Sequence, residues 1–404
     1  GYAQCRQIDQ YGRCTVGQFN WVPENFDATT GNEEATIQAQ RHTALHELVH
    51  VLGGIGPDDV FVDNDTGAPA DPADVWFSRA ETGHFAPRQM TYIKTPRVLE
   101  IARNHFDCQT LEGVPLEDQQ TGKVAHWEAR VLGPELMSYG SATGEVIFGD
   151  ITMAFLEDTN QYVANYSLAG RLLPPSGDTG KDQEYKVMIQ RPDDFEPPVI
   201  HTPGELRWGK NEGCAFVEGS PAEWHEDYFC NRHREFDCTH DNRMSGVCAI
   251  AQFNPFVTDQ FSCGSCDAYD CPSDCTATLN DAPLAGGGWG LPTMFQYFAD
   301  GAAASSAMAT SSAVDPALVG GYMSALDFVP VRHGYWNCQD SQPASNATGA
   351  GAEGGGLSTD SLTEGSADEM KLFGGQAYCP DCRCMKSSLM DFSSGQLDAD
   401  FTTY

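Results

Sequence analysis

The 404-residue sequence has no uninterrupted apolar run that approaches the roughly 18 residues a membrane-spanning helix needs. Basic residues are also scarce, because 23 Lys and Arg stand against 57 Asp and Glu, which gives a formal net charge of −34. A surface of this sign repels phosphate backbones and anionic lipid head groups. We therefore predict no transmembrane segment in this chain and no nucleic-acid partner.

Cysteine, in contrast, is abundant, with fifteen residues that lie mostly in the second half. Such a number indicates a disulfide framework, which persists in oxidising compartments. We therefore interpret the clusters at residues 263–275 and 379–384 as disulfide partners rather than metal knuckles. Because fifteen is odd, at least one cysteine is free or pairs outside this chain.

Three glycosylation sequons agree with export, and their candidate acceptors are Asn64, Asn165 and Asn346. We expect an extracellular or cell-surface protein that travels through the secretory pathway. The sequence starts at Gly1 without the basic and apolar parts of a signal peptide, so any signal peptide or pro-segment is expected upstream.

The spacing of apolar residues predicts helices at residues 30–52, 95–105 and 145–157. Thr30 and Glu33 fit a capping box for the first helix, and Gly53 and Gly54 end it. Residues 57–85 are rich in Asp, Pro and Gly, which predicts an irregular insertion. Residues 171–206 are interpreted as a linker or surface loop, and the Gly-rich tract at 344–369 as a mobile loop.

The segment His46-Glu47-Leu48-Val49-His50 places two imidazoles one turn apart on one helical face, where both can bind a single tetrahedral ion. Glu47 lies beside them and is placed to take a proton from water and return it to a leaving amine. The alternative is two ordinary helix histidines and a surface glutamate. Gly53 favours the zinc site, because a chain that turns sharply off the helix to bring back another ligand needs a residue that tolerates positive φ.

A catalytic zinc needs a third protein ligand and leaves its fourth position open. Position 56 is Gly56, so the compact metzincin pattern, with the third His six residues after the second, is absent. His42 lies eight residues before His50, about 12 Å along the helix axis, so one ion cannot bind both. Spacing alone does not choose among the remaining candidates, which are His84, His105 and His126.

Residues 46–53 are followed much later by the stretch His126-Trp127-Glu128-Ala129-Arg130-Val131-Leu132-Gly133-Pro134-Glu135-Leu136-Met137. Together they resemble the leishmanolysin family of metzincins, in which an inserted subdomain separates the second and third zinc histidines. In that family the Met of the Met-turn follows the third His by eleven residues, which is the interval between His126 and Met137. Matching text at residues 102–108, 151–158, 208–216 and 383–389 extends the resemblance over most of the chain.

The resemblance implies that one Zn²⁺ is bound by His46, His50 and His126, with Glu47 as general base and Met137 as the hydrophobic floor beneath the site. Met137 by itself is interpreted as a core residue, and the family role is also packing.

Two further positions bear on the resemblance, and the first departs from the family pattern. The family commonly has a cysteine where Asn104 stands, which leaves the partner of Cys108 open. Tyr139 is similar in position to an astacin tyrosine that assists at the metal, but a structural role is favoured.

The predicted fold class is α+β: a metzincin-type catalytic domain with an inserted subdomain, followed by a Cys-rich, disulfide-stapled, mainly β or irregular domain. Residues 1–56 would form the end of the N-terminal catalytic subdomain with the active-site helix. Residues 57–206 would hold the insertion, the third zinc ligand, the Met-turn and the following helix. Residues 207–404 would form the Cys-rich domain.

The function that this implies is a zinc-dependent endopeptidase that acts on protein or peptide substrates through water activated by the metal and Glu47. Other extracellular or surface proteins are further candidate partners. The alternative is a non-catalytic extracellular surface protein that retains a zinc-bound peptidase fold, which the acidic, Cys-rich second half suggests. The intact Glu47 favours the enzyme, because a purely structural site needs no base beside the metal.

Overall fold

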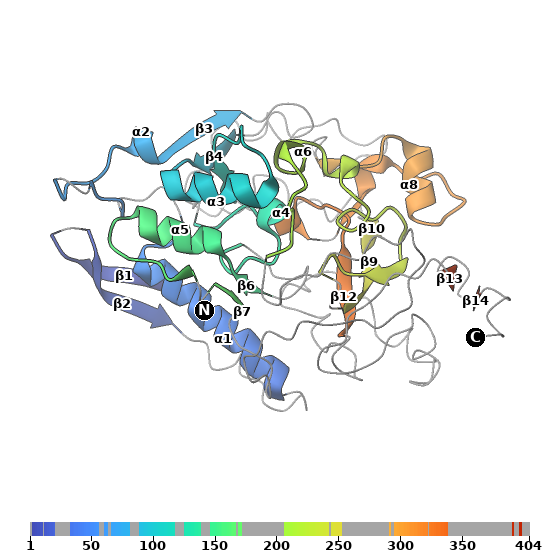
Figure 1. Ribbon diagram of the computed structural model, residues 1–404. Helices are drawn as coiled ribbons and strands as arrows, with labels where there is room; N and C mark the ends of the chain where they lie inside the picture. The colour runs from blue at the N-terminus through green and yellow to red at the C-terminus, as the bar shows by residue number, and fades with distance from the viewer. Residues whose placement is uncertain are drawn as a thin grey trace, which may run out of the picture.

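The computed structural model describes residues 2–10, 12–20, 33–55, 60–63, 66–80, 89–117, 125–138, 146–166, 169–171, 206–241, 244–252, 291, 295–321, 323–337, 390–391 and 396–397. Helices and short antiparallel sheets alternate along the chain (Figure 1), as expected for an α+β peptidase domain. Within these residues, no helix has the length and apolar character to span a bilayer.

A hairpin and a long helix form the N-terminal part of the structure. Strands β1 (Tyr2–Ile8) and β2 (Cys14–Asn20) pair antiparallel, and a disulfide joins Cys5 to Cys14. The hairpin packs on helix α1 (Glu33–Leu52), and a side chain at Gly17 would overlap Val51 of that helix. The predicted helix and its end are confirmed, because α1 stops before Gly54, whose φ is 65° and whose N–H donates to the Val49 carbonyl (2.8 Å). Thr30, the predicted cap, lies outside the described residues.

The expectation of an irregular stretch over residues 57–85 is wrong for residues 72–80. Helix α2 (Pro72–Val75) is capped by Asp71, whose carboxylate accepts the Ala73 N–H, and strand β3 (Trp76–Ala80) follows directly. Strand β3 joins β4 (Gln89–Ile93) and β5 (Val114–Pro115) in a sheet of order β3-β4-β5. Asp and Pro therefore act here as a helix start rather than as signs of irregular chain.

Helices α3 (Pro96–Phe106) and α5 (Asp150–Asp158) pack against each other beside this sheet (Figure 1). Thr95 precedes α3 as predicted, yet the capping acceptor is Asp158, whose carboxylate accepts the N–H groups of Arg97 and Val98 (both 3.0 Å to Oδ2). The third helix begins at Asp150 rather than near residue 145, because β6 (Ile147–Phe148) is an extended pair with β7 (Gly170–Arg171). Along the chain, the short helix α4 (Ala129–Leu132) comes after α3 and before α5.

The second half is built from short elements and disulfides. Helix α6 (Cys214–Glu218) is tied to the end of α3 by the Cys108–Cys214 disulfide, which answers the open question of the Cys108 partner. A second disulfide joins Cys230 to Cys248. The remaining elements are η4 (Pro221–Glu223), β8 (Phe236–Cys238), β9 (Met244–Cys248), β10 (Ile250–Gln252), α8 (Gly301–Ala307), η8 (Pro316–Leu318), β11 (Val319–Gly321), η9 (Ser324–Leu326), β12 (Arg332–Asn337), β13 (Met390–Asp391) and β14 (Gln396–Leu397).

The main hydrophobic core contains residues from Val49 to Val331, and so includes side chains from both sides of residue 206. Trp208 is a buried member of this core, with edge-to-face contacts to Phe216, Trp224 and Tyr228. The division of the chain into three domains stays a prediction. The tract at 344–369, interpreted as a mobile loop, lies outside the described residues. The same holds for residues 172–205 of the predicted linker or surface loop at 171–206, whose first residue belongs to β7.

Candidate metal centre

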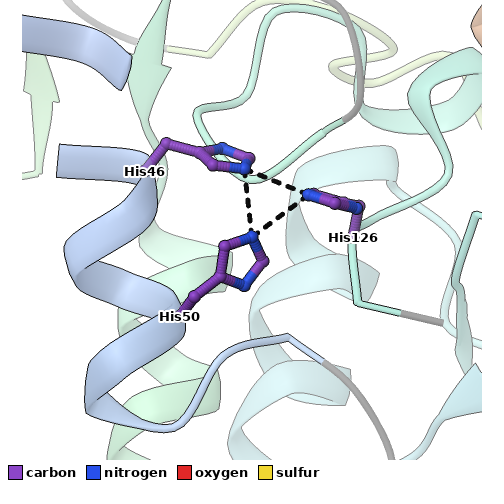
Figure 2. A group of neighbouring side chains, drawn as sticks. All are labelled: His46, His50 and His126. Atoms are coloured by element: carbon purple, nitrogen blue, oxygen red, sulfur yellow. Dashed lines mark hydrogen bonds between the residues drawn. The ribbon is translucent and has the colours of Figure 1, made fainter. Parts of the chain in front are cut away.

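Three imidazoles converge at the C-terminal half of α1. His46 and His50 lie one turn apart on this helix, and His126 approaches from the segment that leads into α4. Figure 2 shows the three rings pointing toward one another. The Nε2 atoms lie 3.0 Å apart for His46 and His126, 3.1 Å for His46 and His50, and 3.2 Å for His50 and His126. The structure therefore brings together two helix residues and one that lies 76 positions further along the chain.

This donor set fits a tetrahedral metal ion. Zn–N bonds of about 2.0–2.1 Å at tetrahedral angles separate two ligand nitrogens by about 3.3 Å, close to the three distances in the cluster. Imidazole is also a preferred ligand of zinc, and three protein ligands leave a fourth position for another group. The cluster can thus hold one metal ion without rearrangement of its backbone.

A backbone carbonyl fixes the orientation of the His46 ring. The Nδ1 atom of His46 lies 2.7 Å from the carbonyl oxygen of Leu136, which can only accept, so Nδ1 carries the hydrogen. In a neutral imidazole the Nε2 atom then presents its lone pair to the other two rings. Donation from the far nitrogen to a carbonyl is the usual support of a metal-binding histidine.

Burial lowers the pKa of all three rings and so favours their neutral form. Desolvation lowers the pKa of His46, despite the opposing effects of the Leu136 carbonyl and Glu47. Desolvation and then the His46 charge lower the pKa of His50 to about 4, and desolvation with both neighbouring histidines lowers that of His126 to about 2. Neutral imidazole is the form that binds metal, so the pocket favours the ligand form before any ion arrives.

Glu47 lies on the same helix and is buried, with a relative exposure of 7%. It lines a cleft together with the three histidines, and residues of the β1–β2 hairpin, including Ala3, Gln4 and Cys5, line the same cleft. A carboxylate in this position can exchange a proton with a molecule held at the histidines.

Several backbone hydrogen bonds hold the His126 segment in place. The Glu117 N–H donates to the His126 carbonyl (3.0 Å), and the Trp127 N–H donates to the Met137 carbonyl (3.0 Å). Met137 itself is fully buried in the core, as both interpretations of the sequence expected. The third imidazole is therefore supported from two sides by segments close to it in sequence.

The other sequence candidates lie elsewhere or outside the description. The Nε2 atom of His105 donates to the Trp208 carbonyl (2.8 Å), which engages this ring away from the cluster. His42 is on α1 but is not in the cluster of three. Asn165 is exposed, whereas His84, Tyr139, Asn64 and Asn346 lie outside the described residues.

Glu135 was not among the site residues predicted from the sequence, although it directly precedes Leu136, whose carbonyl accepts from His46. Its side chain is 1% exposed and accepts hydrogen bonds from Met137, Gly149 and Thr152. Desolvation raises the pKa of Glu135 to about 7, against the opposing effect of these hydrogen bonds. A glutamate inside an otherwise apolar stretch, between Val131 and Met137, is the signal that a sequence reading could have used.

This raised pKa predicts a pH dependence of stability. The folded state holds the Glu135 proton more tightly than the unfolded state, whose carboxyl titrates near pH 4.5. Stability from this group is therefore present below that pH and is lost as pH rises to about 7. The measured quantity is the unfolding free energy of metal-free wild type minus that of metal-free Glu135→Gln. We expect this difference to fall by on the order of 3 kcal/mol as pH rises from 4.5 to 7.5. Urea titrations across this range measure the difference, and a constant difference would contradict the prediction.

Two imidazoles from one helical turn, a third from a distant segment and a buried glutamate in the same cleft form the kind of residue set that metallopeptidases use to hold a metal ion. Comparison with known proteins agrees with this class. The family model described as leishmanolysin matches residues 1–179. The resemblance to leishmanolysin-like metallopeptidases is therefore confirmed.

Individual relatives are distant in sequence, and their names agree with the family match. A leishmanolysin-like peptidase of Drosophila pseudoobscura pseudoobscura is 28% identical over 61% of this chain and 36% of its own length. A leishmanolysin-like peptidase of Caenorhabditis elegans is 28% identical over 55% of this chain and 32% of its own length. Leishmanolysin of Leishmania tropica is 25% identical over 61% of this chain and 25% of its own length. The chain thus spans about a third or less of the length of these curated relatives.

Proposed function

We propose that this chain is the catalytic part of a zinc-dependent endopeptidase. The observation that carries the proposal is the convergence of three imidazole Nε2 atoms within 3.2 Å of one another, in the cleft that Glu47 also lines. In this proposal His46, His50 and His126 hold one Zn²⁺. Support comes from the match of residues 1–179 to the leishmanolysin family.

When bound, zinc supplies a Lewis acid that polarises the peptide carbonyl and makes water easier to deprotonate. Glu47 accepts a proton from the attacking water as the water oxygen bonds to the carbonyl carbon of the peptide. Glu47 then delivers this proton to the amide nitrogen as the carbon–nitrogen bond breaks. Burial of Glu47 in the cleft places the carboxylate where it can serve both transfers.

Proteins or peptides are the proposed substrates, and they would lie in the cleft between the hairpin and α1. Strand β1 forms one wall of this cleft and pairs with β2. An extended peptide could add its backbone to the other edge of β1, a common mode of peptide recognition.

An extracellular or cell-surface location, reached through the secretory pathway, is also proposed. It is supported by the disulfides Cys5–Cys14, Cys108–Cys214 and Cys230–Cys248, since such bonds persist in oxidising compartments. Glycosylation at Asn64, Asn165 and Asn346 belongs to the same proposal.

The test is zinc content measured together with hydrolysis of a protein substrate by the purified, fully processed protein. We expect about one zinc per chain, loss of cleavage with a chelator, and recovery when zinc is restored. Wild-type protein that holds zinc but cleaves no more than its Glu47 variant would support the non-catalytic alternative. Wild-type protein that binds no zinc would overturn the proposed centre itself.

Replacement of the third histidine gives a sharper prediction. His126→Ala removes one of three proposed ligands, so we expect zinc affinity to fall by more than about 100-fold, beyond the 10–100-fold loss typical of outer partners. Competition with a chromophoric chelator measures the affinity. His105→Ala is the matched control, since this ring bonds to the Trp208 carbonyl and should leave zinc affinity unchanged. Equal affinities of the two variants would contradict the assignment of His126.

A further inference from the structure

Glu135 lies in the short segment that supplies the carbonyl for His46. The Leu136 carbonyl, which accepts from His46 Nδ1, is in the residue directly after Glu135. The Glu135 carboxylate folds over this residue and accepts the Met137 N–H at 2.6 Å through Oε2. A closed ring of side chain and backbone therefore fixes the peptide units on both sides of Leu136.

The second carboxylate oxygen, Oε1, connects the segment to helix α5. It accepts the Gly149 N–H at 3.0 Å and the Thr152 hydroxyl at 2.7 Å. The space is close-fitting, because a Cβ added at Gly149 would lie 3.0 Å from the Glu135 Cγ. Glu135 thus binds the start of α5 and the Leu136 segment at the same time.

Hydrogen positions in this network follow from its chemistry. The Trp127 indole N–H can only donate, and it donates to the Thr152 oxygen (2.9 Å). The Thr152 hydroxyl hydrogen therefore points to Glu135. Glu135 thus accepts three hydrogen bonds, from the Met137 N–H, the Gly149 N–H and the Thr152 hydroxyl. A set made only of donors is the pattern that a carboxylate satisfies.

The network reaches both polypeptide segments that form the histidine cluster. Through Leu136 it reaches the ring of His46, and through Thr152 it reaches Trp127, the residue after His126. We infer that Glu135 is a positioning residue for the metal centre, which holds the Leu136 carbonyl and the His126 segment in the geometry that binds the ion. The inference rests on the proposed zinc function.

A merely structural buried carboxylate would affect stability alone, whereas a positioning residue also changes the metal site of the folded protein. The test is Glu135→Gln at pH 8, where the wild-type group is ionised. Gln keeps the shape but places an NH₂ group against a donor. We expect the zinc dissociation constant to rise about 10–100-fold, as for other outer partners of metal ligands. The visible absorption of the Co²⁺-substituted protein should shift as well.

Asp158→Asn is the matched control. Asp158 is a half-buried carboxylate of α5 that accepts two backbone N–H groups, but its partners are at the start of α3. We expect this variant to lose stability while its zinc affinity and Co²⁺ spectrum stay at wild-type values. A folded Glu135→Gln protein with wild-type zinc affinity and spectrum would overturn the inference.

Should Glu135→Gln fail to fold, Thr152→Val decides the question, with Thr152→Ser as the variant that keeps the hydroxyl. Weaker zinc binding by Thr152→Val than by Thr152→Ser supports the inference, and equal binding overturns it. Failure of the wild-type protein to bind zinc is a different result, since it removes the proposed function rather than the role of Glu135 within it.

Discussion

Glu47→Gln should lower kcat by about 10²–10⁴-fold, the range that a positioned general base contributes, while one zinc stays bound per chain. Gln has nearly the same size as Glu but cannot accept the proton of the attacking water. The three histidines, which make the proposed metal contacts, are unchanged. Steady-state hydrolysis of a peptide substrate, with zinc content measured on the same sample, checks both parts of the prediction.

Arg41→Gln is a suitable control for this experiment, because Arg41 is exposed on the same helix. This variant should keep both kcat and zinc content. A Glu47→Gln protein with zinc bound and kcat within a few-fold of wild type would exclude Glu47 as the base, even if the metal centre itself is correct.

Asp327→Asn should destabilise the folded protein by about 3–5 kcal/mol, the cost typical of a buried charge that loses its partner. Arg130 Nε lies 3.1 Å from Asp327 Oδ2, and the side chains are 2% and 0% exposed. Asn is close in shape and tolerates the left-handed backbone at this position, where φ is 54°. The change therefore removes the charge and little else. Denaturant unfolding at pH 7 measures the loss.

The exposed ion pair of Arg79 and Glu112 provides the control for this prediction. Their side chains are 37% and 70% exposed, so Glu112→Gln should change the unfolding free energy by less than about 1 kcal/mol. Similar small losses in both variants would show that solvent or another group compensates Arg130.

The Arg130–Asp327 pair also connects the second half of the chain to the third histidine. Arg130 lies in α4, four residues after His126, and its guanidinium also donates to the Val217 carbonyl. Its own carbonyl accepts the Trp208 indole N–H at 2.9 Å. Residues after position 206 therefore anchor α4, the helix that follows His126, whatever division into domains applies.

The features that the sequence predicted well are local. Helix α1 follows from its apolar spacing and from the two glycines at its end, and the pairing of His46 with His50 follows from the helical period. The choice of His126 came from a family resemblance, because 76 intervening residues leave no local constraint on where that ring lies.

Features that depend on distant partners were missed for a physical reason. Asp158 caps α3 from 60 residues away, and Asp327 meets Arg130 across 197 residues, so neither contact leaves a periodic pattern. Strand β3 was missed because Asp and Pro predict irregular chain, whereas here they start α2 and the strand is stabilised by pairing with β4. Glu135 was passed over because its partners are mostly backbone N–H groups.

The most direct test of the metal centre is X-ray absorption at the zinc edge of the purified, zinc-loaded protein. We expect three imidazole nitrogens at about 2.0–2.1 Å from zinc, with one fewer imidazole in His126→Ala. A first shell that contains sulfur at about 2.3 Å, or a spectrum that His126→Ala leaves unchanged, would contradict the assignment of His46, His50 and His126 as the zinc ligands.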